Sequence, residues 1–324
     1  MYNINDIARI SGYSKSTISA AINNKPGVGK EAREKILNII ERLNYTPNEF
    51  AINVSKGDYK TIAVVVRDIT NSFYARLYRA VESVFETLGY TTLVINTNNN
   101  HERLLDSVKS LIGKRVDGII LDISTLDEKA LQVIKENEIN CVIFGLGSDE
   151  FDSIEADDCK ASYEMTKYLI EKKRRSDILF VCQNIDENEY SKRRYRGIKR
   201  YENESNTKFC EIMDYHQSSS FELGKEIGEK ILARYQQLPS AIIAYNDLIA
   251  AGIIKTFLKH DVDVKEDVIV TGFDNNESIL FSLNTVEIPV YDMGVKAAEL
   301  LLDRIKNRDK KISNIMFDAK LITH

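Results

Sequence analysis

The chain has 324 residues, of which 43% are hydrophobic, and its formal net charge is −5. This length predicts two or three domains, and because the N-terminus is polar from Asn3 onward and no run of eighteen apolar residues occurs, we expect no signal peptide, no membrane span and a cytoplasmic protein. Residues 1–60 carry nine Lys+Arg against six Asp+Glu, whereas residues 61–324 carry 35 against 43, so a phosphate-contacting surface should lie in the N-terminal part.

The first predicted element is a short helix that begins near Asn3. Asn3 and Asp6, three residues later, make a capping pair, and the helix should end near Gly12. Its apolar residues recur at helical spacing and are Ile4, Ile7, Ala8 and Ile10.

A second short helix is predicted within Tyr13 to Asn23. Ser14 is a good N-cap, and one apolar stripe is formed by Ile18, Ala21 and Ile22. The opposite side has only small or long polar side chains and one alanine, which are Lys15, Ser16, Thr17, Ser19 and Ala20. Such a surface could enter a DNA groove, since no large apolar group excludes it.

Two helices joined through a glycine turn make a helix-turn-helix. The alternative is a helical hairpin that packs against its own protein and contacts nothing else, and the N-terminal charge excess also fits an ordinary solvated surface. A third helix is predicted from Lys30 to about Asn44, and its apolar residues should close a three-helix core, namely Ile36, Leu37, Ile40 and Leu43.

Pro47 ends this headpiece, because proline disfavours helix at the preceding residue and cannot continue the hydrogen-bond ladder. Residues 49–56 could then form about two helical turns before Gly57. A helix this short is unstable alone, so we expect it to be ordered only when two such segments meet on DNA.

Beyond Gly57 the sequence alternates between short apolar runs and helical patterns, which predicts an α/β body with parallel sheets. The expected strands are Ile62–Val66, Thr91–Ile95, Gly118–Leu121, Cys141–Phe144, Ile178–Val181, Ala241–Ala244 and Val268–Thr271. The polar pair Asp157-Asp158, followed by a helix over 160–172, indicates a crossing into a second lobe. Two lobes imply a cleft between them.

Seven motifs in order resemble the lactose-repressor (LacI) family of bacterial transcription regulators. They are Asn5-Asp6-Ile7-Ala8, Ser14 through Asn23, Tyr45-Thr46-Pro47-Asn48, Asp68 through Phe73, Arg115 through Ile120, Asn246-Asp247, and Gly272-Phe273-Asp274 followed by Met293-Gly294. The resemblance spans essentially the whole chain. It implies an all-α headpiece over 1–47, a hinge over 48–58, and a periplasmic-binding-protein-like core over 59–324, with an N-lobe of about 59–158 plus 290–324 and a C-lobe of about 159–289.

In the headpiece, the resemblance implies that the second helix contacts operator DNA. Lys15 and Ser16 are the candidates for direct base contacts, with Lys15 directed towards guanine O6/N7, while Ala20 stands where the family often has a long polar residue and could pack on a thymine methyl group. The candidates for holding phosphates are Ser14, Thr17, Asn23 and Tyr45.

In the hinge, the family usually has an apolar wedge, commonly leucine, that enters the minor groove, and Val54 occupies that position. Because valine is shorter and β-branched, we expect it to unstack a base step less deeply. Ile52 replaces a neighbouring arginine and either shares this task or faces a dimer mate.

In the cleft, the resemblance carries over Phe73, Arg194, Asn246 and Asp274 as effector-binding residues. Their chemistry suits a sugar or another polyol, since arginine offers a planar set of donors, aspartate accepts from hydroxyls, and phenylalanine gives an apolar face to a ring. Asn246 is equally well explained as an N-cap followed by an acid. Gly145 stands where the family commonly has an aspartate, so one usual polar partner of the ligand is missing.

The sequence carries no catalytic motif. No Gly-x-Ser-x-Gly elbow or Walker loop is present, the four histidines have no ligand spacing, and the four separated cysteines predict free thiols without disulfide, metal or cofactor. From the family resemblance we expect a ligand-controlled repressor acting as a homodimer on an inverted-repeat operator. The alternative is a small-molecule-binding core with a headpiece that no longer recognises an operator. Assembly should stop at the dimer, because residues 318–324 have no heptad repeat.

Overall fold

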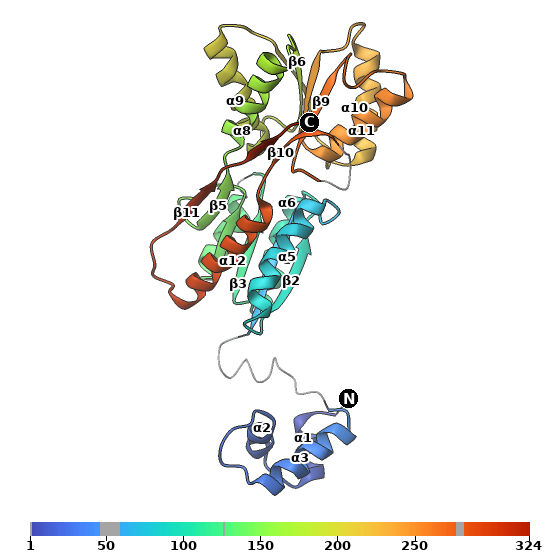
Figure 1. The fold of residues 1–324 in the computed structure, drawn as a ribbon. Coiled ribbons are helices and arrows are strands. Elements are labelled where there is room, and N and C mark those ends of the chain that lie inside the picture. The colour runs from blue at the N-terminus through green and yellow to red at the C-terminus, as the bar shows by residue number, and fades with distance from the viewer. Residues whose placement is uncertain (1, 46–58, 126, 277–281) are drawn as a thin grey trace. The chain divides into compact units, whose positions relative to one another are not determined.

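The computed structural model describes residues 2–45, 59–125, 127–276 and 282–324 (Figure 1). The chain divides into two compact units, residues 1–59 and 60–324. The expected hinge over 48–58, with Ile52 and Val54, lies outside the described residues. Of the described helices, none is long and apolar enough to cross a membrane.

The first unit is a bundle of three helices, α1 (Ile4–Ser11), α2 (Lys15–Ile22) and α3 (Lys30–Arg42). The predicted capping pair of α1 is confirmed, because Asn3 Oδ1 accepts from the Asp6 N–H while Asp6 Oδ2 accepts from the Asn3 N–H at 3.0 Å. Ser14 caps α2 as predicted, with its Oγ 3.1 Å from the Thr17 nitrogen. Gly12 ends α1 with a left-handed φ of 76°, which glycine adopts without strain.

Five buried residues form the core of this bundle, and they are Ile7, Ile18, Ala21, Ile36 and Tyr45. Leu37, which we placed in this core, is 42% exposed, and Ile10, from the apolar stripe predicted for α1, is 40% exposed. Leu37 lies about 100° around α3 from Ile36, away from the side on which Ile36 and Ile40 pack against the cluster.

The N-lobe of the second unit is a six-stranded sheet in the order β11-β5-β4-β3-β1-β2, and its described pairs are parallel. Its strands are β1 (Thr61–Val66), β2 (Thr91–Asn96), β3 (Gly118–Asp122), β4 (Asn140–Phe144), β5 (Asp152–Ala156) and β11 (Asn314–Phe317). Its helices are α5 (Ser72–Glu86), α6 (His101–Gly113), α7 (Glu128–Glu136) and α12 (Val290–Lys306). Alternate residues of β1 face α5 and α12 on one side and α6 and α7 on the other.

The C-lobe has the same layered plan around the order β12-β10-β9-β8-β6-β7. Its strands are β6 (Ile178–Gln183), β7 (Cys210–Tyr215), β8 (Ala241–Ala244), β9 (Ile269–Phe273), β10 (Asn284–Glu287) and β12 (Lys320–Ile322), of which β12 is antiparallel to β10. Its helices are α8 (Asp158–Lys167), continued by a π-helical turn (Tyr168–Lys172), α9 (Glu189–Ser205), α10 (Phe221–Arg234) and α11 (Asp247–Lys259). All seven predicted strands are present, and β5, β7, β10, β11 and β12 were not predicted.

One lobe boundary is corrected by the sheet pairing. We assigned residues 290–324 to the N-lobe, but β12 pairs with β10 in the C-lobe sheet while β11 pairs with β5 in the N-lobe sheet. The chain therefore crosses between the lobes after β5, after β10 and again between β11 and β12. These three crossing segments connect the lobes and limit how one lobe can move against the other.

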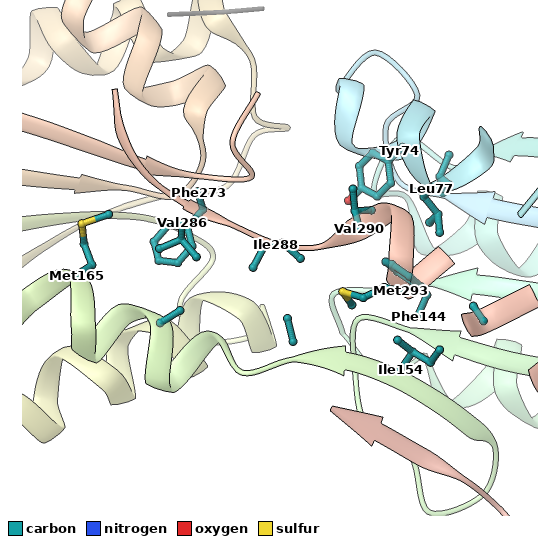
Figure 2. Close-up of a cluster of buried hydrophobic side chains, with 14 of the residues drawn as sticks. Tyr74, Leu77, Phe144, Ile154, Met165, Phe273, Val286, Ile288, Val290 and Met293 are labelled. Carbon is teal, nitrogen blue, oxygen red and sulfur yellow. The ribbon is translucent and has the colours of Figure 1, made fainter. Parts of the chain in front are cut away.

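One apolar cluster continues through this crossing region. Figure 2 shows Ile288 on a crossing segment, with Phe273 and Val286 towards the C-lobe and Phe144 and Met293 towards the N-lobe. All five side chains are buried. The crossing strands are thus packed on both sides by the cores that they join.

Gly197 allows α9 to approach α8. A Cβ atom at Gly197 would lie 2.2 Å from the Cys159 carbonyl oxygen, a backbone atom that cannot turn aside. The close contact brings Arg194 of α9 to Asp158 at the start of α8, with Nε 2.7 Å from Oδ1. Local packing of two helices therefore sets the position of a buried charge.

We predict that Gly197→Ala lowers the free energy of unfolding by about 1–3 kcal/mol, because the added methyl group overpacks the helix contact. Gly113→Ala in α6 is the matched control: nothing lies within 4 Å of its Cβ position, so the control should be neutral or gain up to about 1 kcal/mol. Denaturant unfolding of the two variants measures the difference. Equal stability would show that α9 shifts without cost.

Candidate functional site

The second helix presents a polar surface of hydroxyl groups and one lysine. Ser14, Lys15 and Ser16 are exposed, and the Ser14 Oγ lies 2.8 Å from both the Ser16 and the Thr17 hydroxyl oxygens. Ala20 is half-buried on the same helix. Linked hydroxyl groups beside an exposed lysine can offer donors to base edges and phosphates.

Two of the expected phosphate contacts have structural roles in the headpiece. Asn23 is exposed, and its Nδ2 donates to the Ser19 carbonyl at 2.8 Å, which closes the end of α2. Tyr45 is 8% exposed and packs in the three-helix core, where burial raises the pKa of its hydroxyl. A phosphate contact by Tyr45 stays a prediction, as do the DNA contacts of the other headpiece residues.

The cleft lies where the carboxyl ends of strands from both sheets converge. Residues after β1, β4, β8 and β9 line it, as expected for open α/β sheets, in which ligands collect at this edge. All four predicted effector residues line it: Phe73, Arg194, Asn246 and Asp274. The cavity that remains has a volume of about 60 Å³.

Arg194 is a buried cation at the centre of this wall, and it is 5% exposed. Its Nε donates to Asp158 and its Nη1 to the Tyr245 carbonyl, while the guanidinium carbon lies 3.9 Å from the centre of the Phe273 ring. Among the described residues, its Nη2 has no hydrogen-bond partner. This nitrogen can therefore donate to a molecule in the cleft.

Asp274 follows β9 at a φ of 100° and is 8% exposed. Burial raises the pKa of its carboxyl group to about 6, although nearby Arg194 opposes the rise. Within the described part of the chain, its side chain accepts one hydrogen bond, from Asn71 Nδ2 at 3.5 Å. Most of its accepting capacity is thus available to hydroxyl groups of a ligand.

A polar network beside Asp274 joins the two lobes. On the N-lobe side, Ser72 Oγ donates to Asn276 Oδ1 at 2.7 Å and Arg76 donates to the Asp274 carbonyl at 2.7 Å. On the C-lobe side, Asp247 accepts from the Asn276 N–H and from the Thr285 hydroxyl, both at 2.7 Å. Burial, with a contribution from Asp274, raises the pKa of Asp247 to about 7.

Asn246 and Phe73 reach the cleft in different ways. Asn246 is 3% exposed and caps α11, because its Oδ1 accepts from the Ile249 N–H at 3.1 Å. The interpretation of Asn246 as an N-cap is therefore confirmed. The side-chain amide nitrogen of Asn246 can still donate to a ligand. Phe73 is half-buried in the first turn of α5, and its ring meets the Phe144 ring edge-on at 6.4 Å.

The sequence did not identify three further polar residues that line the cleft, Arg67, Asp158 and Tyr190. It also missed Asp122, which bonds to Arg67 and Tyr190. Arg67 Nε lies 2.6 Å from Asp122 Oδ2, and both side chains are largely buried. Arg67 follows the apolar strand β1 and Asp122 ends the apolar strand β3, and these positions could have identified both residues from the sequence. The pairing itself joins residues 55 positions apart, which no local pattern reveals.

Two family models match the chain. Residues 3–48 match the bacterial regulatory proteins of the lacI family, and residues 59–324 match the periplasmic binding proteins and sugar binding domain of the LacI family. Among curated proteins, the HTH-type transcriptional repressor PurR of Vibrio atlanticus is 31% identical over 95% of this chain and 93% of its own. Catabolite control protein A of Priestia megaterium is 28% identical over 97% of this chain and 95% of its own.

Solved structures show the same fold. A LacI-family transcriptional regulator from Silicibacter pomeroyi has a TM-score of 0.86 at 21% identity, covering 100% of this chain and 98% of that one. The lac repressor dimer bound to operator and an anti-inducer has a TM-score of 0.83 at 21% identity, covering 99% and 98%. The shared fold extends over the headpiece as well as the core.

The raised pKa values of Asp247 and Asp274 predict that stability falls between about pH 4 and pH 7. In this window the native carboxyl groups retain protons that the unfolded chain has lost, so the free energy of unfolding decreases as the pH rises. Asp247→Asn should flatten the decrease, because asparagine resembles the protonated acid: its oxygen can accept from the Asn276 N–H and its amide group can donate to the Thr285 hydroxyl oxygen.

Denaturant unfolding at pH 5 and pH 8 measures this slope. Asp149→Asn, in an exposed loop, is the control and should keep the wild-type slope. At pH 8 the Asp247→Asn protein should be the more stable one by a few kcal/mol. The same decrease in the wild type and in Asp247→Asn would contradict a protonated native carboxyl group.

Proposed function

Because this chain belongs to the LacI family of bacterial regulatory proteins, we propose that it is a repressor whose operator affinity is controlled by a sugar or sugar derivative. As a family member it is a transcriptional regulator with a DNA-binding and an effector-binding domain, and it is not an enzyme. We further propose that it acts as a homodimer on an inverted repeat. Its operator lies in the bacterial cytoplasm, which is where the protein would then act.

The observation that carries the effector proposal is the charge balance of the cleft. Arg67 is paired with Asp122 and Arg194 with Asp158, whereas Asp274 forms no ion pair among the described residues. A phosphate group would be repelled by this carboxylate, but hydroxyl groups can donate to it. A neutral polyol therefore fits the cleft better than a sugar phosphate.

The free donor and the free acceptor lie together. Arg194 and Asp274 both line the cleft, and Phe73 lines it as well and offers an apolar ring. Alternating donors and acceptors over an apolar surface are what a sugar ring requires. The ligand would thus contact both lobes.

Coupling to DNA follows from this position. A ligand held between the lobes stabilises one arrangement of the two lobes over another. The factor by which the ligand changes operator affinity then equals the factor by which the operator changes ligand affinity. One headpiece recognises one half-site, so two copies related by a two-fold axis match an inverted repeat. The alternative, a ligand-binding protein with a headpiece that no longer selects an operator, predicts no sequence preference in the first experiment below.

We predict that Lys15→Ala removes about 1–3 kcal/mol of discrimination at one symmetric base position in each half-site. Lys15 is exposed at the first position of α2, where it can reach a base edge. Selection of binding sites from random DNA, followed by titration of the selected site, measures the loss. Asn23→Ala should weaken all sequences evenly, and Lys35→Ala, on the exposed surface of α3, should leave the motif unchanged. An unaltered motif in Lys15→Ala would assign Lys15 to phosphate or solvent.

We predict that Arg194→Lys loses the effector response while operator binding stays near that of the wild type. Lysine keeps a charge against Asp158 but lacks the planar fork, so the donor to the ligand is lost without a buried, unpaired carboxylate. Arg200→Lys is the control on the same helix, because Arg200 is exposed and pairs with Glu204. A thermal-shift screen of sugars with and without operator measures both properties. Unchanged sugar affinity in Arg194→Lys would remove Arg194 from the ligand site.

A further inference from the structure

Tyr190 crosses the cleft from the C-lobe to the N-lobe. It lies in the first turn of α9, and its hydroxyl donates to Asp122 Oδ1 at the end of β3, 3.3 Å away. The Arg67 guanidinium carbon lies 4.8 Å from the centre of its ring. The ring also packs against the apolar clusters of both lobes. One side chain of the C-lobe is thus held by a buried ion pair of the N-lobe.

Gly145, directly after β4, provides the room for the phenol. A Cβ atom at this position would lie 1.6 Å from the Tyr190 hydroxyl oxygen, so no other residue could stand there with Tyr190 in place. The φ of Gly145 is 91°, which also favours glycine. The Tyr190 hydroxyl therefore lies where an N-lobe side chain would otherwise enter the cleft.

The cleft is nearly full with Tyr190 in this position. The remaining volume of about 60 Å³ holds a few water molecules, whereas ligand pockets enclose several hundred Å³. Tyr190 lines the same cavity as Arg194 and Asp274. It also lies four residues before Arg194, on the same side of α9. A sugar ring does not fit beside Arg194 while Tyr190 stays in this position and the lobes keep this arrangement.

We propose that Tyr190 is a built-in occupant of the effector cleft, which holds the lobes together in the free protein and which the effector displaces. This inference rests on the proposed function. The occupant makes the contacts of a ligand: a hydroxyl donates to Asp122 and an apolar face lies against Arg67. An effector that replaces it must offer the same two features.

Displacement makes the effector bind more weakly than its contacts allow. Only the fraction of molecules with Tyr190 moved aside is competent to bind, and the apparent Kd rises in inverse proportion to that fraction. Two neighbouring contacts between the lobes remain when the ring is removed, because the Glu189 N–H donates to the Ser124 carbonyl at 2.9 Å and Arg193 pairs with Glu155 at 2.5 Å. Removing the ring should therefore leave a cavity that a molecule of the same shape can refill, between lobes that are held less firmly than in the wild type.

The test replaces the ring with a free molecule of the same shape. Tyr190→Ala removes the ring and its hydroxyl group but keeps the Cβ atom, and phenol, which matches the lost group, is the probe. We expect phenol to raise the melting temperature of Tyr190→Ala by several degrees and to leave the wild type unchanged. Tyr195→Ala is the matched control on the same helix, because the Tyr195 ring stacks on Phe180 within the C-lobe. A shift of equal size in Tyr195→Ala, or none in Tyr190→Ala, would overturn the proposal.

A second readout follows function. Tyr190→Ala should change affinity for the selected operator at least fivefold, and phenol should return this affinity towards the wild-type value. Tyr190→Phe keeps the ring and loses only the bond to Asp122, so it should fold like the wild type, show no response to phenol and bind sugars more tightly. A phenol-bound Tyr190→Ala protein whose operator affinity stays altered would overturn the role of Tyr190 in holding the lobes.

Competition is measured with D-ribose, D-glucose and cellobiose. Any of these sugars that binds should bind Tyr190→Ala at least tenfold more tightly than the wild type. A sugar that prefers the wild type would show that Tyr190 contacts the ligand, and displacement would be overturned. If the wild type selects no DNA sequence, the proposed function fails, while the phenol result still decides whether Tyr190 fills the cleft.

Discussion

The buried guanidinium of Arg194 is the interaction on which the geometry of the cleft depends. It joins the start of α8 through Asp158, the end of β8 through the Tyr245 carbonyl, and β9 through the Phe273 ring. Removing one partner of a buried ion pair costs about 3–5 kcal/mol, because the other charge is left without compensation. The same group that fixes three elements of the C-lobe still has one nitrogen free for a ligand, so the architecture and the binding chemistry rest on a single side chain.

The two lobes are joined by more than the three crossing segments. The polar network of Ser72, Arg76 and Asn276 and the apolar cluster around Ile288 both span the boundary. A packed boundary of this kind favours discrete arrangements over continuous bending, because intermediate positions break hydrogen bonds and open voids. A ligand that contacts both lobes can then select one arrangement, which is the physical requirement for coupling the cleft to DNA binding.

Local sequence signals predicted the parts of this protein that depend on local physics. The Asn3 and Ser14 caps and the seven apolar strands follow from residue type and spacing, and the structure contains all of them. The strands that were missed are short or polar: β5 has the sequence Asp-Ser-Ile-Glu-Ala, and β7 alternates at a sheet edge. Their strand character comes from neighbours that are distant in sequence, such as the pairing of β5 with β11. The family resemblance identified Arg194 and Asp274 in the sequence. Asp122, as the partner of Arg67 and Tyr190, could be identified only once the fold was known.

The position of Tyr190 explains why a glycine stands at position 145. The sequence alone indicated a lost polar partner of the ligand, because the family commonly has an aspartate at that position. In the fold, the vacant volume is filled by a hydroxyl group from the opposite lobe, and Asp122 on the adjacent strand supplies the carboxylate that binds it. An acceptor on β3 therefore lies close to the place where an acceptor after β4 would be. The N-lobe side of the cleft therefore still has a carboxylate, that of Asp122. This carboxylate already binds the Tyr190 hydroxyl, so a ligand that uses it must first displace Tyr190.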